Sequence, residues 1–145
     1  MSKMFYMEAN AMSFREKSAM VMIAVLIIAG LFYARQAIAY PGAPVQETLV
    51  PYVLIVVLLS VVAQILLAVL SPREATEPAD ERERRAIDRA GHWSGMVLAL
   101  GVAMTGFVYL LAPDGTTMFH LLVASMLIAQ ISEYCFQLAL FRSAL

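Results

Sequence analysis

Four long apolar runs constrain this chain more than any other feature of its sequence. They cover residues 16–37, 49–70, 91–111 and 118–141, and short polar or charged segments separate them. A helix rises about 1.5 Å per residue and the hydrocarbon core of a bilayer is about 30 Å thick, so each run can cross it as a helix. A helix also satisfies its own backbone hydrogen bonds in lipid. The runs therefore predict an all-α protein with four transmembrane spans.

The composition is typical of a chain that has lipid as its solvent. The 145 residues are 61% hydrophobic and only 14% charged, and the mean hydropathy is +0.76. A water-soluble domain of this size needs more polar surface to cover its core. The net charge of −1 and the absence of interleaved basic and aromatic residues argue against binding to nucleic acid. We expect the lipid bilayer to be the main partner.

Short turns join the spans into two helical hairpins. Residues 40–44 contain two prolines and a glycine, which end the first helix, and residues 112–117 form a tight turn with a threonine cap. Thr48 is expected to cap the second helix, with Pro51 in its first turn. Because short connections make neighbouring helices antiparallel, the prediction is a four-helix transmembrane bundle in a single domain, residues 13–145.

The chain start is expected to be retained as the first span. Residues 1–12 have no apolar period and are interpreted as a tail or an extension, and Ser13 with Glu16 fits a capping box. The competing interpretation is a secretory signal peptide cleaved near residues 37–39, which have the sequence Ala-Ile-Ala. The length of the apolar run, and Arg35 just before that site, favour a retained span.

Residues 80–90 form the dense charged segment of the chain, and a helix that begins at Asp80 is expected to run without a break into the third span. The linker at 71–79, with two prolines, is expected to be irregular and exposed. Three pairs of opposite charge lie four residues apart and should stabilise the helix: Asp80/Arg84, Glu81/Arg85 and Arg84/Asp88. Trp93 should lie where the helix enters the membrane.

Lysine and arginine residues predict the orientation. Basic residues flank the spans on one side only, apart from Arg35: Lys3, Arg15, Lys17, Arg73, Arg82, Arg84, Arg85, Arg89 and Arg142. Since cytoplasmic segments carry the excess of positive charge, both termini and the charged segment are predicted to be cytoplasmic.

The charged segment is also a candidate contact surface. It suits either anionic lipid headgroups or a cytosolic protein, although nearby acidic residues weaken its field. The candidate contact residues are Arg82, Arg84, Arg85, Arg89, His92 and Trp93. A second copy of the chain is a further possible partner.

Polar residues inside the spans are the other candidate site. Glu133 is the only carboxylate within the four apolar runs, apart from Glu16 at the edge of the first. Gln130, Glu133 and Gln137 share one helix face, Tyr134 is adjacent, and Gln64 lies at a similar depth in the second span. Such groups can form a proton or ligand site of a small transporter, as one chain or as a dimer, or an interhelical hydrogen-bond cluster that fixes packing.

No catalytic residue, metal site or cofactor is predicted. His92 and His120 fall at opposite ends of the spans, no known catalytic motif occurs, and the single Cys135 is expected to be a buried apolar side chain. Gly91 and Gly95 open the third span, and Gly101, Thr105 and Gly106 follow. These small residues are expected to pack internally rather than in a dimer. The chain is therefore interpreted as non-enzymatic.

Three segments resemble a family of small bacterial inner-membrane proteins of unknown function. They are Ser13-Phe-Arg-Glu-Lys-Ser18, Asp80-Glu-Arg-Glu-Arg84 up to Ile87, and the Gln130…Glu133…Gln137…Arg142 pattern of the last span. The resemblance covers Met12 to the end of the chain. It implies a four-helix protein of the bacterial inner membrane with a retained N-terminus, and it implies no activity or functional residue.

Overall fold

The computed structural model describes residues 12–143, and they form five helices. The four long ones are α2 (Phe14–Ala39), α3 (Val45–Leu70), α5 (Glu81–Leu111) and α6 (Gly115–Ser143), and the short one is α4 (Pro72–Thr76). Each long helix is long and apolar enough to cross a membrane. The described part of the chain contains no strand. The predicted all-α fold with four candidate spans is confirmed, and it fits a multi-pass membrane protein.

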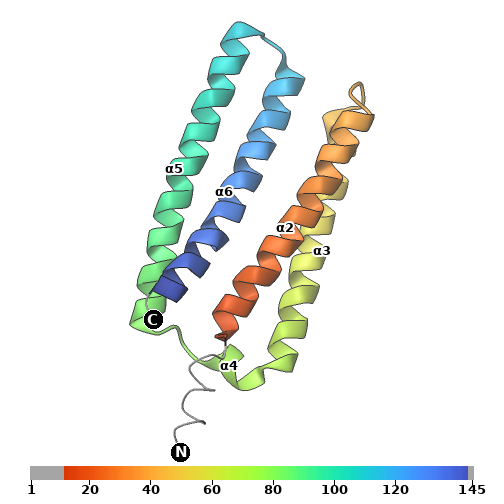
Figure 1. Ribbon diagram of the computed structural model, residues 1–145. Coiled ribbons are helices and arrows are strands. Elements are labelled where there is room, and N and C mark those ends of the chain that lie inside the picture. Colours follow the sequence, from red (N-terminus) through yellow and green to blue (C-terminus); the bar gives the residue numbers. More distant parts are fainter. Residues whose placement is uncertain (1–11, 144–145) are drawn as a thin grey trace, which may run out of the picture.

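The long helices form two hairpins that pack side by side in a row (Figure 1). The extensive contacts are those of α3 with α2, of α2 with α6, and of α6 with α5. Helices α2 and α6 are therefore central, and α3 and α5 lie at the two edges. None of the most apolar window of α3 is buried, although α3 has the highest hydropathy of the four helices. This edge needs an apolar neighbour, which a lipid bilayer provides.

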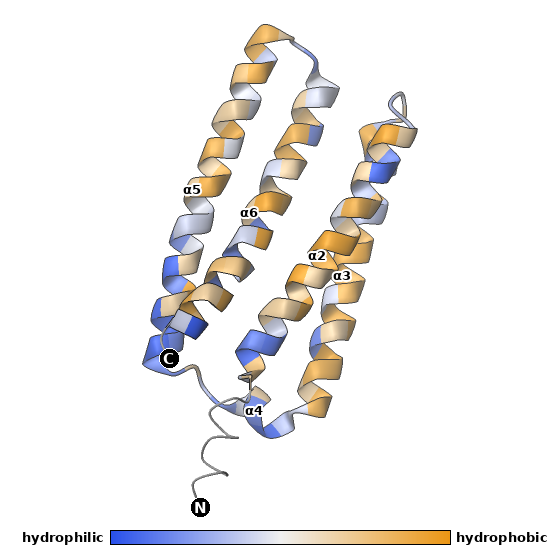
Figure 2. Ribbon diagram, in the orientation of Figure 1, coloured by the Kyte–Doolittle hydropathy of each residue, from blue (hydrophilic) through white to orange (hydrophobic). Residues whose placement is uncertain are grey.

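Charged residues gather at one end of the row (Figure 2). We call this the basic end: it contains the first residues of α2 and α5, the last residues of α3 and α6, and all of α4. The other end, called the opposite end, contains the connections after Ala39 and after Leu111. Most of the surface between the two ends is apolar, as a hydrocarbon solvent requires.

Two capping boxes start helices at the basic end, the one at Ser13 as predicted and a second at Asp80, where the sequence predicts a helix start. The Ser13 hydroxyl accepts from the Glu16 backbone N–H, and the Glu16 carboxylate accepts from the Ser13 backbone N–H. Asp80 and Glu83 form the same arrangement before α5. α5 then continues without a break to Leu111, so the charged segment and the third span are one helix, as predicted.

The predicted start of the second span was wrong by one turn. α3 begins at Val45, directly after Pro44, so Thr48 lies inside the helix and is buried rather than acting as a cap. Pro51 consequently lies beyond the first turn. A proline there has no N–H to donate to the carbonyl of Glu47. Membrane helices tolerate such an interruption where neighbouring groups satisfy the backbone.

The linker between the hairpins is not wholly irregular. Pro72 begins the short helix α4, because proline is favourable in the first helical turn. The Thr76 hydroxyl then donates to the carbonyls of Pro72 and Arg73 near the end of this helix. The expected exposure is correct for most of the segment, and Ala75 and Ala79 are half-buried.

Small residues do allow close approach of helices at Gly101, as predicted, but not at Gly91 and Gly95. A side chain at Gly101 would collide with Ser125 across α5 and α6, and one at Gly30 would collide with Leu127 across α2 and α6. Gly91 and Gly95 instead face open space, so the expectation of internal packing there was wrong. The helix periodicity does not say which face of α5 meets α6.

The single cysteine also differs from expectation. Cys135 is a free, exposed residue of α6 rather than a buried one. Cys135 lies within a candidate span, so an exposed thiol there would face lipid, where it behaves as a small apolar group. The error arises because an apolar residue of a membrane helix is equally stable facing lipid or protein.

Candidate functional site

Three ion pairs hold the basic end together. In each pair, one partner belongs to the first turn of α2. Arg15 Nε lies 2.9 Å from Glu83 Oε2, Lys17 Nζ lies 3.3 Å from Glu74 Oε2, and Arg142 Nε lies 3.8 Å from Glu16 Oε1. They connect α2 to α5, to α4 and to α6 in turn. α2 is thus the helix to which the other three elements are joined by ion pairs at this end.

Acidic and basic side chains of the basic end lie mostly on different faces of α5. Four acidic residues line a groove of about 350 Å³ beside Arg15 at the start of α2: Glu74, Glu77, Asp80 and Glu83. This is most of the acidic charge that the sequence places near the arginine run. These carboxylates therefore do not neutralise the arginines on the other face of α5.

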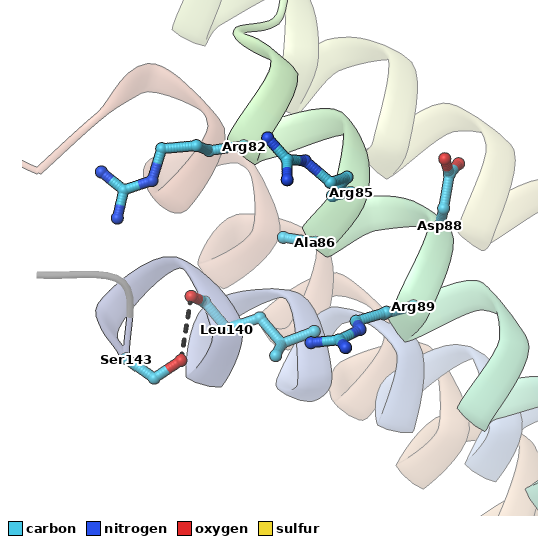
Figure 3. Close-up of a pocket in the computed structure, with 7 residues that line it drawn as sticks. All are labelled: Arg82, Arg85, Ala86, Asp88, Arg89, Leu140 and Ser143. Carbon is cyan, nitrogen blue, oxygen red and sulfur yellow. Dashed lines mark hydrogen bonds between the residues drawn. The ribbon is translucent and has the colours of Figure 1, made fainter.

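The other face carries the basic groove, which lies between α5 and the end of α6 and has a volume of about 620 Å³. Three arginines at helical spacing line it together with Ala86, Asp88, Leu140 and Ser143: Arg82, Arg85 and Arg89 (Figure 3). The Arg89 side chain reaches across toward Leu140 on α6, whereas the Asp88 carboxylate points away from it. Positive charge is thus concentrated over the last turn of α6.

Two arginines of the groove, Arg85 and Arg89, have weak or no pairing within the described residues. Arg85 donates to the Glu81 carbonyl at 3.3 Å, and its guanidinium lies 3.9 Å from the Glu81 carboxylate, with both side chains well exposed. Arg89 has no ion-pair or hydrogen-bond partner among residues 12–143. Of the three predicted charge pairs along the helix, only that of Glu81 with Arg85 forms within the described residues.

The remaining candidate contact residues lie near the groove without lining it. Arg84 and His92 are exposed elsewhere on α5. Trp93 is 40% exposed, and its ring meets Phe136 of α6 edge to face, with centroids 5.4 Å apart. This aromatic pair lies about one turn beyond Arg89, so it separates the charged part of α5 from the apolar part.

The intramembrane polar residues form two separate groups rather than one cluster. Gln137 Nε2 donates to Glu133 Oε1 at 3.4 Å, within α6 itself. Gln64 instead accepts from the Ser18 hydroxyl at 3.0 Å, across α2 and α3, and it shares a groove with Tyr134. Gln130 is exposed.

The sequence interpretation missed a cluster at the opposite end. The Tyr33 hydroxyl and His120 Nδ1 lie 2.6 Å apart and share a hydrogen bond, whose donor depends on the imidazole tautomer. The ring of Tyr52 stands edge to face on Tyr33 at 5.1 Å. Tyr33 is 5% exposed and Thr48 nearby in α3 is 4% exposed. α2, α3 and α6 are therefore joined here by aromatic and imidazole contacts, and residue spacing gives no signal for such a meeting.

The turn between α5 and α6 is closed by Asp114 rather than by a threonine. Its carboxylate accepts from the Thr117 hydroxyl and from the backbone N–H groups of Thr117 and Thr116. The Thr117 hydroxyl is the largest influence that holds the pKa of Asp114 below its ordinary value of 3.8, followed by the Thr117 backbone. The predicted threonine cap was wrong, although Thr117 takes part as a donor.

No metal site and no relative support a chemical assignment. Among the described residues, no three His, Cys, Asp or Glu side chains gather to hold a metal ion. In comparisons with protein-family models, curated proteins and solved structures, no match to this chain was found. A function is therefore inferred from the geometry and charge of the grooves alone.

Proposed function

We propose that this chain is a non-enzymatic, multi-pass protein of the bacterial inner membrane whose basic groove binds the phosphate of an anionic lipid headgroup. The observation that carries the proposal is the sorting of charge at the basic end. Glu74, Glu77, Asp80 and Glu83 lie beside α2, while Arg82, Arg85 and Arg89 line a separate groove in which Asp88 is the one acidic residue.

The chemistry of the groove suits a phosphate. A guanidinium presents several N–H donors in a planar fork, which matches phosphate oxygens. Arg89 has no partner within the described residues, and the pairing of Arg85 with Glu81 is long and exposed. A phosphate between these two side chains would replace weak contacts by charge-assisted hydrogen bonds. Leu140 provides an apolar wall for the part of the lipid below its phosphate.

The position of the groove favours a lipid over a cytosolic protein. Trp93 follows Arg89 by about one helical turn, and indole rings are enriched at the level of the headgroups. The groove thus lies in the layer that lipid phosphates occupy. A cytosolic protein would have to reach into that layer to contact Arg89.

Lipid binding can be measured by native mass spectrometry of the protein released from nanodiscs that contain anionic and zwitterionic phospholipids. We expect anionic lipid to be retained by the wild type and lost from the double variant Arg85→Gln/Arg89→Gln. Each arginine near the surface contributes about 1 kcal/mol, so affinity should fall about tenfold or more. The matched control is Arg73→Gln, which removes a charge at the same end outside the groove.

Equal loss of anionic lipid from Arg73→Gln would indicate general charge attraction and contradict the proposed groove. Unchanged lipid binding in the double variant, with loss of a co-purifying cytosolic protein, would assign the surface to a protein partner instead. Addition of inorganic phosphate separates the two sources of phosphate chemistry. A free anion as the ligand would be displaced by it, whereas a lipid held by its acyl chains would remain.

The proposed orientation places both termini and the basic groove in the cytosol. It is supported by the gathering of the described basic residues at one end of the row, with Arg35 alone of them near the other. Reporter fusions after Gly42 and after Ala79 should report opposite compartments. The same compartment for both would contradict the orientation.

A small transporter is the second candidate function, and Glu133 is the observation in its favour. Its carboxylate lies within a candidate span, is half-buried, and has among residues 12–143 only the long hydrogen bond from Gln137. Proton or cation flux into proteoliposomes should then depend on Glu133 and be abolished by Glu133→Gln. Absence of flux in the wild type would exclude this function for the conditions and cations tested.

A further inference from the structure

A second groove, about 550 Å³ in volume, opens toward lipid where α2, α3 and α6 meet. We call it the inner groove. Its walls are apolar at Met22 and Ile65, and polar at Ser18, Ser60, Gln64 and Tyr134. Polar groups of three helices converge here without a charged side chain in the lining. Such a surface is unusual for a helix face that meets only acyl chains.

The polar groups of the inner groove have unused hydrogen-bonding capacity. Gln64 accepts from Ser18 through its side-chain oxygen, and its amide NH₂ has no acceptor among residues 12–143. The Tyr134 hydroxyl has no hydrogen-bond partner within the same residues. The Ser60 hydroxyl oxygen is buried, again without a partner in the described chain. In hydrocarbon, where no water replaces a missing partner, each of these groups is costly.

The depth of the groove limits what can supply the missing acceptors. α3 runs from Val45 to Leu70, so at 1.5 Å per residue Gln64 lies about 10 Å from the helix midpoint and Ser60 about 4 Å. The hydrocarbon core extends about 15 Å from the bilayer centre. With α3 centred in the bilayer, both side chains therefore lie below the level of phospholipid phosphates and esters. The partner must be a molecule that brings its polar atoms into hydrocarbon.

We infer that the inner groove binds the ring of a lipid-soluble molecule with carbonyl acceptors, of the quinone class. Gln64 and Tyr134 are placed to donate to its carbonyl oxygens, and the ring and its apolar tail lie along Met22 and Ile65. The absence of a cation in the lining excludes a phosphate as the group that is recognised. This inference concerns binding only, and it is independent of the basic groove and of the transport candidate.

The experiment uses the full chain in nanodiscs and a decyl-substituted benzoquinone that carries a photoreactive group on its tail. Crosslinked peptides are identified by mass spectrometry, and affinity is measured by competition with the unlabelled benzoquinone. We expect labels near Ser18, Ser60 or Tyr134. Tyr134→Phe and Gln64→Leu should each weaken binding about fivefold or more, because each removes one donor.

The matched control is Tyr109→Phe, which makes the same chemical change on an exposed part of α5 outside the groove. It should bind like the wild type. Tyr134→Phe keeps the ring and its packing, so it tests the hydrogen bond even if Gln64→Leu fails to fold. Labels scattered along all helices, or equal affinity of Tyr134→Phe and wild type, would overturn the inference. So would displacement by a diacyl phospholipid as effective as that by the benzoquinone, because the occupant would then be an ordinary lipid.

Discussion

The two ends of the helix row are held together by different physics. At the basic end, pairs such as Arg15 with Glu83 connect α2 to its neighbours through side chains that are about 30% exposed (33% and 27%). At the opposite end, Tyr33 joins α3 and α6 through ring contacts and one short hydrogen bond, and it is 5% exposed. Exposed ion pairs contribute little free energy, whereas a buried ring contributes several kcal/mol. The opposite end should therefore be the more stable of the two.

This difference suits a protein whose basic end binds a ligand. Arginines that are not committed to strong internal pairs remain available to a phosphate. The opposite end, for which no ligand is proposed, is held together by packing. The four predictions that follow measure the difference, and they begin with the largest expected effect.

Removal of the Tyr33 ring should destabilise the protein most. Tyr33→Ala deletes a buried aromatic side chain, its contact with Tyr52 and its hydrogen bond to His120, so the free energy of unfolding should fall by roughly 3 kcal/mol or more. Denaturant titration in detergent micelles measures the change. A loss below about 1 kcal/mol would mean that the opposite end is as weakly held as the basic end.

Removal of the hydroxyl alone should have a smaller effect. Tyr33→Phe keeps the ring and loses the bond to His120 Nδ1, which should cost about 1 kcal/mol. A double-mutant cycle with His120→Phe isolates the pair, because both variants keep a ring. Additive effects of the two substitutions would show that the rings, and not the hydrogen bond, hold this end.

Breaking an ion pair at the basic end should cost still less, and the cost should depend on salt. Arg15→Gln should lower the free energy of unfolding by less than about 1 kcal/mol in dilute buffer. The difference from wild type should shrink toward zero near 1 M salt, where the Debye length is about 3 Å. The same titration of Tyr33→Phe is the control, and its effect should not change with salt. A salt-independent loss in Arg15→Gln would indicate that packing, not charge, is affected.

The smallest effect is expected at Asp114, and it should depend on pH. The pKa of Asp114 is lowered in the folded state, so its contribution to stability is fully present above 3.8 and is lost as pH falls below 3.8 through the lowered folded value. Asp114→Ala should therefore be slightly less stable than wild type at neutral pH and equal to it in strong acid. Thermal unfolding at several pH values tests this. A difference that persists in strong acid would contradict the charge-assisted cap.

Local features of the fold were predictable from the sequence because they depend on neighbouring residues. The capping boxes at Ser13 and Asp80 and the unbroken helix from Glu81 to Leu111 follow from short patterns. The start of α3 was missed because Pro44 occupies the position before the helix, so Thr48 falls inside it and is buried by tertiary contacts. Side-chain chemistry alone does not distinguish a capping threonine from a buried one.

The candidate sites were predictable in part. Periodicity placed Glu133 and Gln137 near each other, and the structure joins them by a hydrogen bond. It also placed Gln64 at a similar depth, but its partner is Ser18, because α2 and not α6 is the main neighbour of α3. The meeting of Tyr33 with His120 depends on the same neighbour order, which no spacing reveals.

The sequence by itself determined that this chain has four helices suited to lipid, where α2 and α5 begin, and that basic charge marks one end. Only the tertiary structure decided that the helices stand in the row α3–α2–α6–α5, which acidic groups the first turn of α2 gathers, and which arginines are left to line a groove. The physical reason is that helix formation and charge count are local properties of the chain. In lipid, the hydrophobic effect does not favour one helix as a neighbour over another. Which helices pack together therefore depends on close contacts such as Gly101 with Ser125 and on matched polar groups.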